Sequence, residues 1–287
     1  MRTQLLSAFL LSAAFLPAQG APATATRIDL PPGGTTVPML DLGGRPMVEV
    51  RINGKGPYAL LVDTGASATV IDETFVKELG VDAQSNGTLK FDELRLGDLV
   101  VHGFQAHVFR GGLPALGGAI PLRGILSAAA FPGNLLLLDY PQQRVTVKPG
   151  ALPAADDQRV FEYHADEELP IIPVTIAGHV YRIHMDSGAP SGVTLPTKYA
   201  SELPLVAPPV EVGHARTQAG TFPVSLATLN GTIAIGAYPL ELRDVKFSDL
   251  RPGPEPGIGN VGGEVLRGFI VTFDAKNRRV KLERPSV

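Results

Sequence analysis

The fold is decided by the stretch LLVDTGASATVI at residues 60–71, which the chain repeats in altered form as IHMDSGAPSGVTL at residues 183–195. Each copy is an apolar run, an Asp-Thr/Ser-Gly-Ala turn and a second apolar run. This pattern predicts two β-strands joined by a tight connection. Glycine lets the backbone turn where a side chain would block it, and the hydroxyl beside the aspartate can satisfy backbone groups of the turn.

The repeat extends on both sides of these turns. Upstream, VRING at residues 50–54 matches VTIAG at residues 174–178, and downstream the block at residues 124–133 aligns without a gap with residues 259–268. One Asp-Ser/Thr-Gly triplet means little, because ordinary chains contain such triplets by chance. Two copies inside a longer repeat indicate a duplicated structure. The sequence therefore predicts two tandem lobes of one design.

The residue pattern of both lobes is typical of β-strands. Short alternating runs are separated by Gly, Pro, Asn and Asp, as at residues 48–52 and 94–101. Short helices are expected only at residues 74–79, 127–131, 197–203 and 263–267. We therefore expect an all-β protein built from two barrel-like lobes with a few short helices.

The expected division places the N-terminal lobe at residues 24–149 and the C-terminal lobe at residues 159–287, joined by a Pro/Gly-rich linker at residues 150–158. Residues 1–23 have the pattern of a secretory signal peptide: Arg2, a short apolar core and small residues near a cleavage site. The core is short for a bilayer span, so we expect export to the periplasm or the exterior, with no membrane span in the mature chain. A retained membrane anchor is the alternative.

Composition excludes several functional classes. The net charge of -3 leaves no basic face for nucleic acid, and the absence of cysteine excludes disulfides and thiolate chemistry. His102, His107 and His184 belong to no closed ligand set in the sequence, so we expect no metal and no cofactor.

The turns at residues 63–65 (Asp-Thr-Gly) and 186–188 (Asp-Ser-Gly), each inside a duplicated β-rich lobe, resemble the two half-sites of an aspartic protease of the retropepsin/pepsin superfamily. The downstream blocks resemble the apolar-apolar-Gly segment that crosses behind the catalytic turn in this family. The resemblance covers about residues 28–284 and is closest to a bacterial-type, single-chain, fused retropepsin. It implies an endopeptidase that acts on peptide or protein substrates, is monomeric, and has its active-site cleft between the lobes.

The resemblance also implies roles for individual residues. Asp63 and Asp186 would activate a water molecule as a coupled base and acid, since two carboxyls about 3 Å apart share one proton, as is general for aspartic proteases. The residues expected to support the turns are Thr64, Gly65, Ser67, Ser187 and Gly188. The two hydroxyls of Thr64 and Ser187 would link the turns, and the glycines would donate backbone N–H groups to the carboxylates.

Two segments occupy the positions of substrate-covering flaps, at residues 84–91 and 214–222. The substrate-binding candidates on them are Asn86, Gly87, Arg216 and Gly220. Asn-Gly is a strong tight-turn pair, and a flap would hold an extended substrate by backbone pairing. Both segments could equally be plain surface hairpins.

Three residues depart from the family pattern. Pro190 stands opposite Ser67, Ser127 replaces a glycine, and Asn260 replaces an apolar residue. These changes leave both carboxylates in place but could weaken the support of the turns. They motivate an alternative function, a catalytically weak or inactive homologue that binds peptides. A structural envelope protein without peptide affinity is a third reading.

Overall fold

The computed structural model describes residues 8–9, 27–113, 120–163, 169–217, 220–249 and 257–285. Apart from Ala8–Phe9, which forms strand β1, the expected signal peptide lies outside these ranges. The described chain consists mainly of β-strands arranged in curled sheets, which confirms the expected all-β class. No helix in the described ranges is long and apolar enough to span a membrane.

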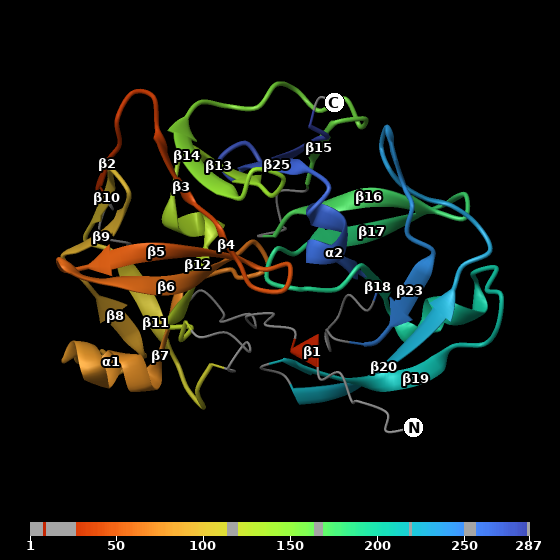
Figure 1. Ribbon diagram of the computed structural model, residues 1–287, viewed down its shortest axis with the longest axis horizontal. Helices are drawn as coiled ribbons and strands as arrows, with labels where there is room; N and C mark the ends of the chain where they lie inside the picture. Colours follow the sequence, from red (N-terminus) through yellow and green to blue (C-terminus); the bar gives the residue numbers. More distant parts are fainter. Residues whose placement is uncertain are drawn as a thin grey trace.

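Each half of the chain builds one large sheet (Figure 1). In spatial order the first sheet contains β2 (Arg27–Asp29), β10 (Leu99–His102), β9 (Glu93–Leu96), β5 (Pro46–Ile52), β6 (Lys55–Asp63), β12 (Gly124–Ser127), β7 (Val70–Asp72), β11 (Gln105–Phe109) and β8 (Thr88–Lys90), with β4 (Leu40–Asp41) on β5. The second contains β1, β19 (Val210–Thr217), β20 (Gly220–Thr228), β23 (Asp244–Phe247), β18 (Val193–Leu195), β24 (Gly259–Val261), β17 (His179–Met185), β16 (Ile171–Ile176), β21 (Ile233–Ile235) and β22 (Tyr238–Leu240).

The sequence repeat appears as a repeated strand arrangement. In the first half, β12 runs parallel to β6 and antiparallel to β7. In the second half, β24 runs parallel to β17 and antiparallel to β18. Each downstream block therefore lies between the strand that leads into its aspartate turn and the strand that leaves it.

A third sheet joins the two halves, and its strands are β15 (Val160–Glu162), β26 (Arg279–Glu283), β25 (Ile270–Asp274), β13 (Asn134–Asp139), β14 (Arg144–Pro149) and β3 (Thr35–Pro38). Antiparallel pairing of β13 with β25 makes the connection, seen at the top of Figure 1. The largest apolar cluster contains buried side chains from both halves. The expected linker also packs here, because Leu152 is buried and its N–H donates to Asp274 Oδ2 at 2.9 Å. The boundaries of the lobes stay a prediction.

The expected short helices are confirmed as α1 (Glu73–Leu79), η1 (Ala128–Ala130), η2 (Thr197–Ser201) and α2 (Gly263–Leu266). Asp72 caps α1 by accepting from the N–H groups of Thr74 and Phe75, and Gly80 ends it in a left-handed conformation. These local signals lie within the helix and its flanks, which is why the sequence located α1 within one residue of its start.

Candidate active site

Both aspartate turns lie at the ends of buried strands, Asp63 at the end of β6 and Asp186 directly after β17. The two residues are 0% and 1% exposed. A Cβ on Gly65 would lie 2.8 Å from Asp186 Oδ1 and 2.9 Å from Asp63 Oδ1. The two carboxyl groups, far apart in the sequence, therefore meet at one point.

The hydroxyls of the turns cross-link the two halves. Thr64 Oγ1 donates to the carbonyl of Met185 at 2.6 Å and accepts from the N–H of Ser187 at 3.0 Å. Reciprocally, Ser187 Oγ donates to the carbonyl of Val62 at 2.8 Å and accepts from the N–H of Thr64 at 3.0 Å. Because both side chains are buried, these four bonds hold the turns in one relative position.

The glycines of the turns allow the carboxyls to approach. The N–H of Gly65 donates to Asp63 Oδ1 at 2.7 Å, and the N–H of Gly188 donates to Asp186 Oδ1 at 2.9 Å. A Cβ on Gly188 would lie only 2.4 Å from Asp63 Cγ. Any side chain at Gly188 would push the opposite carboxyl away.

Ser67 and Ser127 differ in the hydrogen bonds that their side chains make. In the described part of the chain, Ser67 makes no hydrogen bond to Asp63, although it lies on the same turn. Ser127 Oγ donates to the carbonyl of Ala66 at 2.6 Å and accepts from the N–H of Ala129 at 3.2 Å. The serine that replaces a glycine thus ties the first turn to η1.

Asn260 contacts the second aspartate directly. Its Nδ2 donates to Asp186 Oδ2 at 3.0 Å. From the sequence, Asn260 is a change that could alter the support of the turn, and the structure makes it a donor to the carboxylate. In the sequence repeat Asn260 aligns with Ile125, and both lie in the downstream block that passes beside an aspartate turn. This alignment is the signal that could have placed Asn260 next to Asp186.

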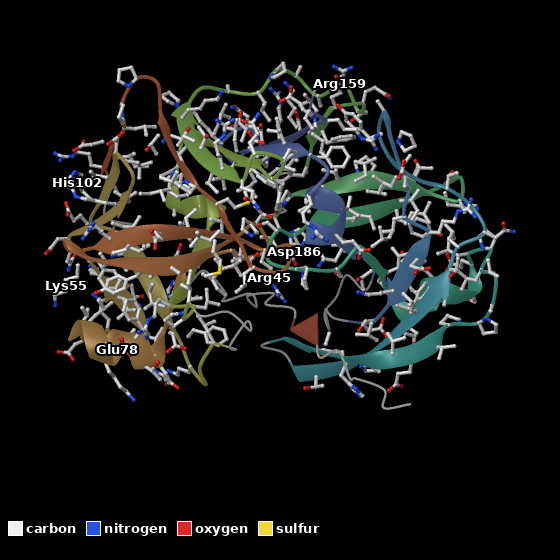
Figure 2. All side chains as sticks on the ribbon, in the orientation of Figure 1. Arg45, Lys55, Glu78, His102, Arg159 and Asp186 are labelled. Carbon is white, nitrogen blue, oxygen red and sulfur yellow. The ribbon has the colours of Figure 1, made fainter. Side chains whose placement is uncertain are left out.

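Arg45 is a second residue that the sequence did not single out. It lies in the connection between β4 and β5, is 8% exposed, and its Nε donates to the carbonyl of Gly188 at 3.1 Å. In Figure 2 Arg45 and Asp186 lie close together in the middle of the molecule. Burial lowers the pKa of Arg45, while the charges of Asp186 and Asp63 act in the opposite direction. A buried cation therefore adjoins both carboxyls.

The first expected flap does not project as a hairpin. Residues 84–88 form a tight turn in which the N–H of Gly87 donates to the carbonyl of Gln84 at 2.8 Å. The residues that follow, Leu89 and Phe91, are buried in the main core. In Figure 1 this segment lies with α1 on the side of the first half away from the second. Substrate contact by Asn86 and Gly87 stays a prediction.

The second expected flap is a long two-stranded hairpin, β19 and β20, that carries Arg216 and Gly220 near its end. Ala215, Val224 and Phe222 of this hairpin pack against Ala189, three residues beyond Asp186. The hairpin therefore covers the second aspartate turn. β1 pairs in parallel with β19 at Ala215 and Arg216.

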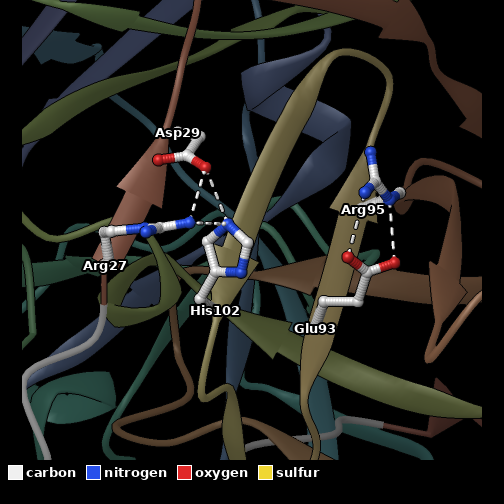
Figure 3. A network of polar contacts seen from close by, with 5 residues as sticks. All are labelled: Arg27, Asp29, Glu93, Arg95 and His102. Carbon is white, nitrogen blue, oxygen red and sulfur yellow. Dashed lines mark hydrogen bonds and ion pairs between the residues drawn. The ribbon is translucent and has the colours of Figure 1, made fainter.

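A separate polar network lies on the surface of the first half (Figure 3). His102 Nε2 lies 2.7 Å from Asp29 Oδ2 and 2.9 Å from Arg27 Nη2. The hydrogen bond with His102 lowers the pKa of Asp29. Within the described ranges no cluster of three or more His, Asp or Glu side chains is placed to hold a metal ion.

Residues 48–90 match the family model of the aspartyl proteases. The match confirms the resemblance to aspartic proteases and supports a protease function in general. It contains the Asp63 turn and ends in β8, so the matched residues do not include the Asp186 turn. No curated protein matches the chain.

Proposed function

We propose that this chain, whose residues 48–90 match the aspartyl proteases, is an exported aspartic endopeptidase that uses Asp63 and Asp186 as a coupled pair. The observation that carries the proposal is the meeting of two buried carboxyls between cross-linked turns. Two carboxyls at such short range do not both ionise easily, so one holds a proton while the other is a carboxylate.

The pair supplies both functions that peptide hydrolysis needs. The carboxylate takes a proton from water, whose oxygen attacks the carbonyl carbon, and the protonated partner gives its proton to the carbonyl oxygen. When the tetrahedral diol collapses, the C–N bond breaks and the amine leaves with the proton that was taken from water. One hydroxyl of the diol gives its proton back to the pair of carboxyls and becomes the new carbonyl oxygen. The pair then again holds one proton.

The surroundings favour this chemistry because they are rigid and polar where the charge develops. Backbone N–H groups hold the carboxyls and the two hydroxyls hold the turns before substrate arrives, so little reorganisation is needed during the reaction. The β19–β20 hairpin packs against the second turn, and its β19 edge pairs with the strand β1, which is the kind of pairing that would hold an extended peptide.

The test is cleavage of an unfolded protein by the chain without residues 1–23, from about pH 3 to pH 8. Asp63→Asn and Asp186→Asn should each lower kcat/KM by about 10³-fold or more, because either loss leaves the pair without its acid or base. Asp157→Asn, on an exposed residue of the linker, is the matched control and should retain activity. Full activity in Asp63→Asn or in Asp186→Asn would contradict the proposal.

The alternative predicts a different result in the same assay. If folded wild-type protein retains a peptide without cleaving it, and Asp63→Asn changes the affinity little, the chain is a peptide-binding module. Export is tested separately by locating the full-length protein and reading the N-terminus of the mature form. Cytoplasmic protein that still carries residues 1–23 would contradict it.

A further inference from the structure

A row of polar side chains crosses the second sheet beside Asp186, where the first sheet has an apolar row. Asn260 of β24 is paired directly with His184 of β17 and Thr194 of β18. Directly paired residues on neighbouring strands share one face of a sheet. The equivalent pairs in the first sheet join Ile125 to Leu61 and Val70.

The row in the first sheet buries only apolar side chains, whereas the row in the second sheet buries polar groups. Leu61, Ile125 and Val70 belong to one apolar cluster. In the second row His184 and Thr194 are 0% and 3% exposed, and Asn260 Oδ1 and Thr194 Oγ1 are buried without a hydrogen-bond partner among the described residues. Burying polar groups in place of aliphatic ones lowers stability. The exchange therefore indicates a role other than packing.

The contact of Asn260 identifies that role. Asp186 Oδ1 already accepts from the N–H groups of Gly188 at 2.9 Å and Ala189 at 3.1 Å. Asn260 Nδ2 adds a donor on the other oxygen, Oδ2, at 3.0 Å. Hydrogen bonds donated to a carboxylate favour its ionised form. Ile125, at the equivalent place beside Asp63, has no group that could donate.

We propose that Asn260 is a positioning residue that makes the two carboxyls unequal, keeping Asp186 as the carboxylate and leaving the shared proton on Asp63. The catalytic meaning of this assignment rests on the proposed function. Asp186 then takes the proton from water and Asp63 gives its proton to the carbonyl oxygen of the substrate.

Other charged and titratable groups surround the second turn. They are Asp63 from β6, Arg45 from the β4–β5 connection and His184 on β17, with the exposed Glu264 of α2 beside Gly192. The charges of Asp186 and Asp63 both raise the pKa of Arg45, and its Nε donates to the carbonyl of Gly188 in the Asp186 turn. His184 Nε2 faces the carbonyl of Thr64 at 3.4 Å. All four groups are left unchanged in the test below.

The test is an NMR titration of the aspartate carboxyl carbons in the wild type, Asn260→Leu and Asn260→Ala. In the wild type the carbon of Asp186 should follow the lower apparent pKa of the pair and that of Asp63 the higher. Loss of the amide donor should raise the lower apparent pKa by about 1. Ile125→Leu, at the equivalent place in the first lobe, is the control and should leave both unchanged. The alanine variant gives the same reading if the leucine variant does not fold.

Activity provides the second readout. The acid limb of the kcat/KM profile should move to higher pH in Asn260→Leu by the same amount as the titration. The inference is overturned if the carboxyl carbon of Asp63 follows the lower apparent pKa. It is also overturned if neither variant changes the titration, even when the enzyme is active. If the titration moves as expected but folded wild-type protein cleaves nothing, the proposed function fails while the assignment of the proton stands.

Discussion

Single side chains hold the two turns together, and Thr64 is the clearest case. Its hydroxyl donates to one buried backbone group of the opposite turn and accepts from another. Ser187 repeats this arrangement from the other side. The asymmetry of the site also arises from a single residue, since Asn260 stands where the repeat has the apolar Ile125 in the first lobe.

Thr64→Val should lower the free energy of unfolding by about 3 kcal/mol, because it leaves the carbonyl of Met185 and the N–H of Ser187 buried without their partner. Urea unfolding measures the change. Thr36→Val is the control, since the hydroxyl of Thr36 bonds only at the surface. Equal stabilities of the two variants would show that the cross-links contribute nothing.

Secondary structure elements decide how the two lobes differ. In the second lobe the antiparallel partner of β23 belongs to the long β19–β20 hairpin, whereas in the first lobe the strand at the matching place, β8 beside β11, has three residues. α1 is anchored through Asp72, whose Oδ2 accepts from the N–H of Leu113 at 2.6 Å while Oδ1 caps the helix. One carboxylate thus fixes both the helix and the chain that follows β11.

Asp72→Ala should destabilise the protein by about 1 to 2 kcal/mol at neutral pH. Burial acts to raise the pKa of Asp72, but hydrogen bonds from Thr74, Leu113 and Phe75 outweigh it and hold the pKa below its ordinary value of 3.8. A depressed pKa in the folded state contributes stability that is present above pH 3.8 and is lost as pH falls through the folded-state value.

Urea unfolding at several pH values, with the exposed Asp82→Ala as control, checks this expectation. The difference between wild type and Asp72→Ala should shrink as the pH is lowered below 3.8. A difference that is independent of pH would assign the loss to packing instead of the charge.

The whole molecule is held together by the third sheet, which draws strands from both halves of the chain. Leu138 of β13 is fully buried and is paired with Val271 of β25. The apolar cluster that contains both residues extends through both halves. We therefore expect the two halves to unfold together.

Leu138→Ala should shift one shared unfolding transition and cost about 3 kcal/mol, because it removes buried methyl groups and leaves a cavity. Far-UV circular dichroism and tyrosine fluorescence, followed in urea, should report the same midpoint. Val212→Ala, at a side chain that is 45% exposed, should change it little. Two separate midpoints would show that the halves are independent domains.

The sequence by itself determined the duplicated design, the all-β class, the short helices and the two aspartate turns. These features are encoded locally, in turn chemistry, capping residues and the alternation of apolar residues, so a few neighbouring residues are enough to predict them. The tertiary structure alone decided that Asn260 donates to Asp186, that Arg45 reaches Gly188, and that the turn at residues 84–88 leads into the short strand β8, with Leu89 and Phe91 in the core. Those contacts depend on strand register and on the meeting of distant segments, which no local pattern specifies.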